Sequence, residues 1–261
     1  MEAPLNHPMQ DPLVIHGQNG KSIGQHVEDR HLVMKLGHLE PAALSGEVLI
    51  VSVLFADLRG FTAVAEQWTP RHAARFLNAY LTAMVDVIRG RLGMVQDFVG
   101  DGIMAVFGAP SPDPDHAWHA AVSALEMQSA LECLERLQMA GPIRLGMGVS
   151  IHSGEVFAGT VGSPEQSKYA AVGDTVNTGS RLEELNRALG TSILMSGETI
   201  ALLGNQVKAN GLGWFPLRGK NNLIEVFELL ALRRCANELS FRAPCPHPGK
   251  GLTCRSNGAT G

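Results

Sequence analysis

Residues 48–62 read VLIVSVLFADLRGFT. The first nine of these residues are almost all apolar and rich in β-branched side chains, which predicts a strand buried on both faces. Asp57 follows where this run stops, and a carboxylate at the end of a strand can hold a divalent cation. The alternative is that Asp57 only caps the helix predicted for the next residues.

That helix is expected to begin at Phe61 and to run to Trp68. Backbone N–H groups at the start of a helix have no partner within it, so they can bind phosphate oxygens. The segment from Leu58 through Gly60, Phe61 and Thr62 is therefore a candidate phosphate-binding segment.

Outward from this stretch, the hydrophobic pattern predicts further helices and strands. Helical spacing predicts helices over 70–89, 117–137 and 175–189, the last of them closed by Gly190 as a C-cap. Strands are predicted over 94–99, 103–107, 143–151 and 155–161, and short strands over 192–195, 214–217 and 224–229. This order predicts an α+β fold with a ferredoxin-like βαββαβ core and a C-terminal αβ extension.

A second carboxylate, Asp101, lies in a Gly-Asp-Gly turn between two of these strands. Asp-Gly between strand-like runs is a strong hairpin signal, so the residue also fits a simple turn aspartate. If this hairpin lies beside strand 48–56, Asp57 and Asp101 approach each other and repel unless they share a cation. Mg²⁺ and Mn²⁺ prefer oxygen ligands and phosphate, and a metal pair promotes displacement at phosphorus.

A third candidate group lies on the helix predicted over 175–189. Asn177 and Arg181 are four residues apart and therefore share one helix face. An amide and a guanidinium on one face can bind a ribose oxygen and a phosphate, because the planar fork of Arg matches phosphate geometry. The alternative is that Arg181 pairs with Glu183 or Glu184 on a solvated face.

Composition and charge restrict the class of protein. The chain has 261 residues, 45% hydrophobic and 18% charged, which suffices for one ordinary domain with a core. Poor apolar patterning at both ends predicts a flexible leader over 1–46, a folded domain over 47–230 and a disordered tail over 231–261. A formal net charge of −4 argues against nucleic acid as a partner, since there is no basic surplus to neutralise its phosphates.

No apolar run reaches the roughly 18–20 residues that a membrane helix requires. The first residues also lack the basic start and apolar stretch of a secretory signal. We therefore expect a cytoplasmic protein without a membrane span.

Three segments together resemble the class III adenylate and guanylate cyclase catalytic domain. They are residues 55–62 (FADLRGFT), 99–108 (VGDGIMAVFG) and 172–183 (VGDTVNTGSRLE), and they occur in the family's order and at its usual separations. Residues 146–156 (GMGVSIHSGEV) and 217–229 (LRGKNNLIEVFEL) match supporting strands of the family. The resemblance covers residues 47–230.

This resemblance implies an enzyme that makes a cyclic nucleotide as a second messenger. The 3′-hydroxyl of a purine nucleoside triphosphate attacks its own α-phosphorus, and pyrophosphate leaves. Asp57 and Asp101, with the Leu58 carbonyl, would bind two Mg²⁺ or Mn²⁺ ions per site.

The resemblance also implies a homodimer with shared active sites. Asn177 and Arg181 would come from the partner chain, with Asn177 orienting the ribose and Arg181 stabilising charge on the α-phosphate. Lys220, or Arg218 beside it, would contact the β- and γ-phosphates. No side chain is identified as a general base.

Purine choice in this family rests on two positions, which here are Asp97 and Ala170. Adenylate cyclases commonly have Lys at the first and Asp or Thr at the second. Asp97 can accept hydrogen bonds from guanine N1–H and N2–H₂, or can point to solvent, while Ala170 offers no hydrogen bond. The resemblance to bacterial members favours ATP, with weak discrimination against GTP. The alternatives are a guanylate or dual-specificity cyclase, and a non-catalytic module that binds nucleotide.

Overall fold

The computed structural model of the chain describes residues 46–136, 145–163, 166–220 and 222–233. The predicted leader and tail thus lie outside the described residues, apart from residue 46 and residues 231–233. The elements, in chain order, are β1 (Gly46–Arg59), α2 (Phe61–Ala65), α3 (Pro70–Gly90), β2 (Met94–Val99), β3 (Gly102–Phe107), α4 (His116–Arg136), β4 (Gly146–Gly162), β5 (Ser167–Val172), α5 (Asp174–Leu189), β6 (Ile193–Ser196), α6 (Gly197–Leu203), the 3₁₀ helix η1 (Gly204–Gln206), β7 (Val207–Pro216) and β8 (Leu223–Leu232).

These strands form one sheet of eight strands in the order β2-β3-β1-β4-β6-β8-β7, with β5 paired to β4. β1 is antiparallel to both β3 and β4, whereas β6 runs parallel to β4. The first four strands and the two helices α3 and α4 follow each other as βαββαβ, with β1 between β3 and β4. This is the ferredoxin-like core that the sequence predicts, and the α+β fold is confirmed.

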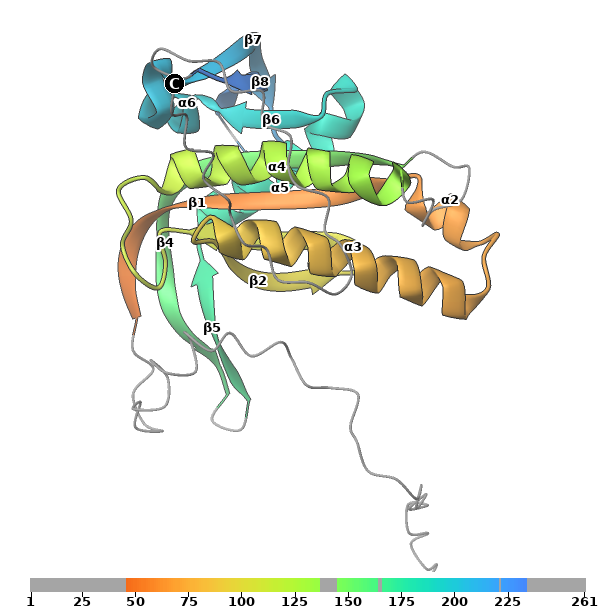
Figure 1. Cartoon of the computed structure of the whole chain (residues 1–261). Helices are drawn as coiled ribbons and strands as arrows, with labels where there is room; N and C mark the ends of the chain where they lie inside the picture. Colours follow the sequence, from red (N-terminus) through yellow and green to blue (C-terminus); the bar gives the residue numbers. More distant parts are fainter. Residues whose placement is uncertain (1–45, 137–144, 164–165, 221, 234–261) are drawn as a thin grey trace, which may run out of the picture. The chain divides into compact units, whose positions relative to one another are not determined.

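Helices cover both faces of the central strand. α3 and α4 lie side by side over one face (Figure 1), where Leu54 and Leu58 of β1 join the larger buried cluster. On the other face, Gly179 of α5 packs so closely that a Cβ there would lie 2.9 Å from the Phe55 ring. Alternate side chains of β1 are therefore buried on opposite faces, as the apolar run predicts.

The limits of two helices follow from local chemistry. Thr69 caps α3, since its side chain accepts a hydrogen bond from the backbone N–H of His72, and Pro70 occupies the first turn. At the end of α5, Gly190 is the C-cap with φ 67°, a left-handed conformation that glycine adopts without strain. The prediction for Gly190 is confirmed.

The predicted strand pair over 143–151 and 155–161 is wrong, because β4 is one strand of 17 residues. It pairs with β1 from Gly46↔Gly159 to Arg59↔Gly146. Gly154, in the gap between the two predicted strands, makes no turn. A Cβ at Gly154 would lie 2.7 Å from the Thr175 hydroxyl, so glycine here allows α5 to pack against the strand.

Other elements extend beyond the predictions. α6 and β5 were not expected, α2 ends three residues before Trp68, and β8 continues to Leu232, past the predicted end of the domain at 230. None of the helices in the described ranges is long and apolar enough to cross a membrane.

Candidate active site

Asp57 lies within β1, close to its end, because the strand continues through Arg59 before Gly60 turns the chain. Its Cα partner across the sheet is Gly148 of β4. The sequence predicts Asp57 just after the strand. In the structure, Asp57 is still part of the strand, two residues before its end. Its side chain is 30% exposed, so solvent and ligands can reach the carboxylate.

Asp101 occupies the turn between β2 and β3 and lies close to Asp57. A Cβ at the neighbouring Gly102 would be 3.7 Å from Asp57 Oδ1. Burial first, and then the negative charge of Asp57, raise the pKa of the Asp101 carboxyl. The structure therefore brings together the two carboxylates that the sequence singled out.

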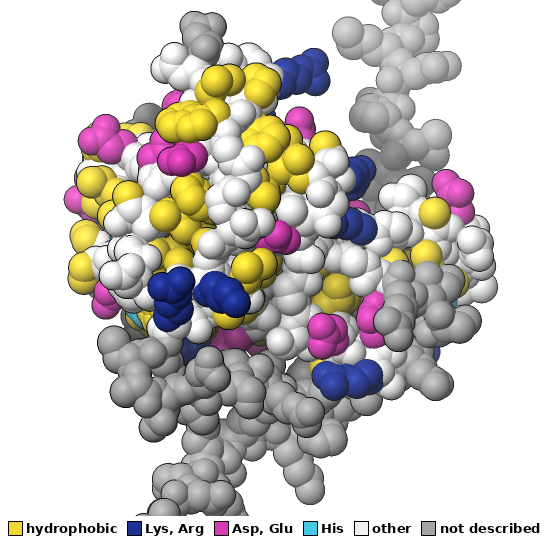
Figure 2. All heavy atoms as spheres, turned by 90° about the horizontal axis from the view of Figure 1, so that it is seen from above, with side chains coloured by type: hydrophobic (Ala, Val, Ile, Leu, Met, Phe, Trp, Pro, Cys, Tyr) yellow, Lys and Arg dark blue, Asp and Glu magenta, His cyan; other side chains and the backbone are white. Residues whose placement is uncertain are grey.

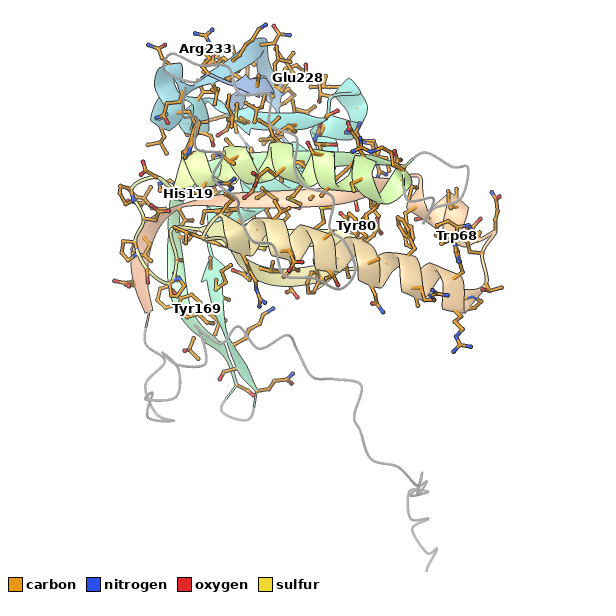
Figure 3. The ribbon with its side chains drawn as sticks, viewed as in Figure 1. Trp68, Tyr80, His119, Tyr169, Glu228 and Arg233 are labelled. Atoms are coloured by element: carbon orange, nitrogen blue, oxygen red, sulfur yellow. The ribbon has the colours of Figure 1, made fainter. Side chains whose placement is uncertain are left out.

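Tyr80 of α3 (Figure 3) is buried close enough to this pair for the charges of both carboxylates to act on its phenol. The phenol is fully buried and donates a hydrogen bond to Met147 Sδ at 3.6 Å. Burial raises its pKa above the usual value, and the charges of Asp101 and Asp57 raise it further. The two carboxylates thus stand at the edge of the core, with one side in protein and the other toward solvent.

Arg187, in the last turn of α5, was not selected from the sequence. Its Nη2 donates to Asp57 Oδ2 at 2.9 Å, with the Arg187 side chain 67% exposed. Glu183, one turn earlier, has its carboxyl pKa raised by burial and then by the charge of Asp57. In the sequence, Arg187 only fits a cation that offsets the dipole at a helix C-terminus, and nothing marks it as a neighbour of Asp57.

The residues at this edge fit a divalent cation of the magnesium type. No group of three or more His, Cys, Asp or Glu side chains among the described residues is arranged to hold a metal. An ion here would depend on the two carboxylates, the Leu58 carbonyl, water and phosphate oxygens, which is the ligand set that Mg²⁺ prefers. The mutual repulsion of Asp57 and Asp101 is what such an ion would relieve.

The predicted phosphate-binding segment leads from β1 into α2. Gly60 is the N-cap with φ 82°, and no side chain caps the helix. The Phe61 ring stacks on Phe76 at 5.9 Å between centroids and meets Trp68 edge-on at 6.4 Å. The ring therefore anchors the segment to α3, while the backbone of Gly60, Phe61 and Thr62 remains next to Asp57 in the chain.

Asn177 and Arg181 lie on α5 as predicted, with Asn177 exposed and Arg181 half-buried. A Cβ at Gly219 would be 3.4 Å from Arg181 Nη2, so the loop between β7 and β8 lies directly against the guanidinium. The ion pairs found among the described residues join Arg181 to neither Glu183 nor Glu184.

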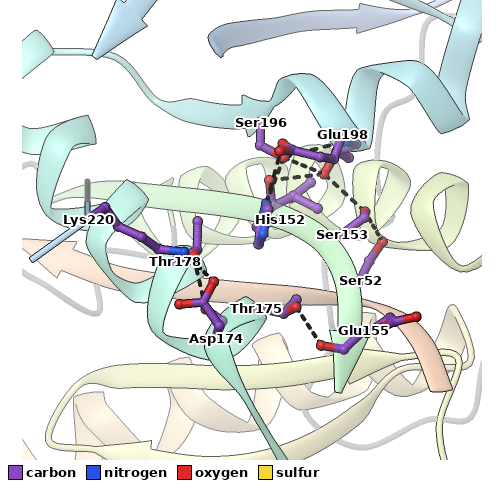
Figure 4. A network of polar contacts seen from close by, with 12 residues as sticks. Ser52, His152, Ser153, Glu155, Asp174, Thr175, Thr178, Ser196, Glu198 and Lys220 are labelled. Carbon is purple, nitrogen blue, oxygen red and sulfur yellow. Dashed lines mark hydrogen bonds and ion pairs between the residues drawn. The ribbon is translucent and has the colours of Figure 1, made fainter. Parts of the chain in front are cut away.

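Lys220 reaches the same part of α5 from that loop. Its Nζ is hydrogen-bonded to Asp174, and this contact, more than any other, lowers the pKa of the Asp174 carboxyl. Both residues line a pocket of about 420 Å³ with His152, Thr178 and Glu198 (Figure 4). Arg218, two residues earlier, is exposed. The loop that carries Gly219 thus brings the Lys220 ammonium to the start of α5 and lies against the Arg181 guanidinium near the middle of the helix.

The two predicted base-reading positions lie on β2 and β5. Asp97 does not simply point to solvent, because its Oδ2 accepts a hydrogen bond from Lys168 Nζ at 2.6 Å. Ala170 is 4% exposed and offers only a methyl group.

Asp57 and Arg181 lie on different sides of α5. Arg187 contacts Asp57, and Arg181 lies six residues earlier on the same helix. Six residues correspond to about 9 Å along the axis and a rotation of about 240°. Arg181 therefore points away from the Asp57 side of α5, and Asn177 is a further turn away. The carboxylate pair and the Asn177–Arg181 face are therefore separate within one chain.

The sequence profile described as the adenylate and guanylate cyclase catalytic domain matches residues 46–229. The chain belongs to this family. Among solved structures, the cyclase fold is similar to the adenylyl cyclase CyaB from P. aeruginosa, with a TM-score of 0.68 and 27% identity over 73% of this chain and 98% of that one. It is equally similar to the guanylyl cyclase Cya2, with a TM-score of 0.68 and 33% identity over 74% of this chain and 97% of that one.

A curated relative is Adenylate cyclase 1 of Rhizobium meliloti (strain 1021), 33% identical over 188 residues. The match covers 72% of this chain but 28% of the relative, so this cyclase domain corresponds to a minor part of that protein. Both an adenylyl and a guanylyl cyclase are therefore among the similar proteins, and the choice of purine must be argued from the site.

Proposed function

We propose that this chain is the catalytic domain of an adenylate cyclase, which converts ATP into 3′,5′-cyclic AMP and pyrophosphate. The observation that carries the proposal is the approach of Asp57 and Asp101 at the end of β1 in a cyclase fold. In the reaction, the 3′-oxygen of the substrate bonds to its own α-phosphorus. The bond from that phosphorus to the bridging oxygen of pyrophosphate breaks, and the hydroxyl proton is released.

Asp57, Asp101 and the Leu58 carbonyl would hold two Mg²⁺ or Mn²⁺ ions per site. When bound, such ions polarise the phosphate and lower the pKa of the attacking hydroxyl. The backbone of Gly60 to Thr62 would take phosphate oxygens at the start of α2. Lys220 would leave Asp174 to contact the β- and γ-phosphates, with Arg218 as the neighbouring cation.

Asn177 and Arg181 would act on a nucleotide held by the carboxylates of a second copy. Arg181 would stabilise charge that builds up on the α-phosphate, and Asn177 would orient the ribose. The two groups would then be half-sites, the carboxylate pair on one chain and the Asn177–Arg181 face on the other. Their separation within one chain supports a homodimer with two equivalent active sites.

Exposed apolar surface also supports a second copy as the partner. Seen from above, hydrophobic side chains gather on the side of β7 and β8 (Figure 2), and Trp214, Leu223 and Leu230 of these strands are all exposed. Across β1, β4 and β5, the residues Val48, Phe157 and Val172 pair in register and are also exposed. Large apolar side chains outside the core are common where protein surfaces associate.

The test is product analysis after incubation with ATP or GTP and Mn²⁺. We expect cyclic AMP as the main product, with some cyclic GMP. Cyclic GMP as the main product would favour the guanylate alternative. Nucleotide binding without any cyclic product would favour a non-catalytic module.

A further inference from the structure

β2 and β5 are held together by side chains next to the two predicted base-reading positions. The pairing of β2 with β3 shifts between Val95 and Asp97, which leaves Gln96 as an extra residue. A bulge of this kind bends a strand and re-aims its side chains. The Gln96 amide donates to the Ala171 carbonyl at 3.2 Å and accepts from the Ala171 N–H at 2.7 Å. The Gln96 side chain thus satisfies both backbone groups of Ala171, as a neighbouring strand would, and fixes β5 beside Asp97.

Lys168 adds a cation at this place. Its Nζ is 2.6 Å from Asp97 Oδ2, and the two side chains are 56% and 51% exposed, so a ligand can reach both. Lys168 and Ala170 are two residues apart on β5 and therefore lie on the same face. The ammonium of Lys168 thus lies on the face of β5 where Ala170 supplies no polar atom.

We propose that Lys168 is a specificity-determining residue, which together with Asp97 recognises the purine and shifts the choice toward ATP. The inference rests on the proposed function and names how its site selects the base. Adenine presents an acceptor, N1, beside the donor amino group on C6. The ammonium of Lys168 can donate to N1 while the free oxygen of Asp97 accepts from the amino group.

The same ion pair weakens the recognition of guanine. A lone carboxylate at position 97 offers both oxygens to guanine N1–H and N2–H₂. Here Lys168 engages one of these oxygens, so the two-pronged contact is no longer available without breaking the ion pair. Lys168 on β5 thus supplies a hydrogen-bond donor for the base, which Asp97 on β2 does not offer.

A purely structural role for the pair makes a different prediction. Exposed ion pairs contribute little to stability, and Gln96 already joins β2 to β5. If Lys168 only tied the strands together, its removal would change the affinity for ATP and GTP by the same factor. The ratio of the two affinities therefore separates a role in recognition from a role in folding.

The experiment measures binding of 3′-deoxy-ATP and 3′-deoxy-GTP, which lack the attacking hydroxyl, by calorimetry with Mn²⁺. We expect Lys168→Met to move the affinity ratio toward the guanine nucleotide by about tenfold, the size of one lost base contact. Asp97→Ala should also move it toward the guanine nucleotide, because adenine loses the acceptor for its amino group. Lys168→Arg, which keeps a cation, should change it less than Lys168→Met. Lys208→Met, at an exposed lysine of β7, is the control and should leave the ratio unchanged.

The kcat/KM ratio for ATP and GTP should follow the binding ratio. A ratio that changes less than twofold in both variants, or that moves toward the adenine nucleotide in Lys168→Met, would overturn the inference and leave the cyclase activity standing. A wild-type protein that binds the analogues but forms no cyclic product would overturn the proposed function, while the binding ratio would still decide the role of Lys168. Binding of neither analogue would overturn both.

Discussion

At the scale of single residues, the fold brings two carboxylates close together at the candidate site. Burial and the charge of Asp57 raise the pKa of Asp101, which means that the ionised pair is unfavourable without a cation. Arg187 offsets part of this charge at Asp57 Oδ2. A divalent ion has a higher charge density and supplies two positive charges, so we expect it to compete with Arg187 for that oxygen.

We predict that Asp57→Ala and Asp101→Ala each lower cyclase turnover by at least about a hundredfold, since loss of metal-held charge removes several kcal/mol of transition-state stabilisation. The melting temperature of the wild type should rise with added Mn²⁺, and this rise should be reduced in both variants. Asp86→Ala, at an exposed aspartate of α3, is the control for a lost negative charge. Variants that keep near wild-type turnover would refute the metal assignment.

At the scale of elements, the packing of α5 on β4 depends on the missing side chain of Gly154. We predict that Gly154→Ala destabilises the domain by about 1–3 kcal/mol, because the new Cβ would meet the Thr175 hydroxyl at 2.7 Å. Gly90→Ala is the control, since a Cβ at this helical position meets nothing within 4 Å. It should be neutral or stabilise by less than about 1 kcal/mol. Urea unfolding measures both, and equal midpoints would contradict this reading of Gly154.

A buried polar network joins several elements (Figure 4). Ser52 of β1 contacts Ser153 at 2.7 Å, and Ser196 contacts His152 at 2.8 Å. Ser52 also contacts His116 at 2.8 Å. Thr199 links the two ends, at 3.0 Å from Ser153 and 3.3 Å from Ser196. Since all of these hydroxyls are buried, the network is favourable only while each group keeps its partner.

Burial lowers the pKa of both His116 and His152. Nearby carboxylates oppose this shift: Asp113 and Asp115 raise the pKa of His116, and Glu198 and Asp174 raise the pKa of His152, but burial is the larger effect. The unfolded chain therefore binds protons first as the pH falls below about 6.5. As far as these histidines are concerned, the free energy of unfolding should be highest above this pH and should decrease toward pH 5.5. The decrease should be at most about 1.4 kcal/mol per pH unit for each histidine. His116→Asn with His152→Asn should flatten this slope in urea unfolding between pH 5.5 and 7.5. An unchanged slope would show that other groups cause it.

At the scale of the whole molecule, the sequence predicts the core order and the approach of Asp57 to Asp101, because these depend on periodicity and on local motifs. It fails where contacts between distant segments decide the structure. Gly154 reads as a break between strands until α5 is packed against it. Lys168 and Arg187 carry no local signal either, since their partners Asp97 and Asp57 are 71 and 130 residues away in the chain.

The separation of the half-sites gives the last prediction. Because Asp57 and Arg181 do not converge within one chain, each variant, Asp57→Ala or Arg181→Ala, should be inactive alone. A mixed dimer keeps one intact site, formed by Asp57 of one chain and Arg181 of the other. Random exchange makes half of the dimers mixed, each with one site of two, so activity should return to about a quarter of the wild-type level. Mixing Asp57→Ala with Asp101→Ala is the control and should restore nothing, because both changes affect the same half-site. If exchange between chains is confirmed by differently tagged copies and no activity returns, the shared site is refuted.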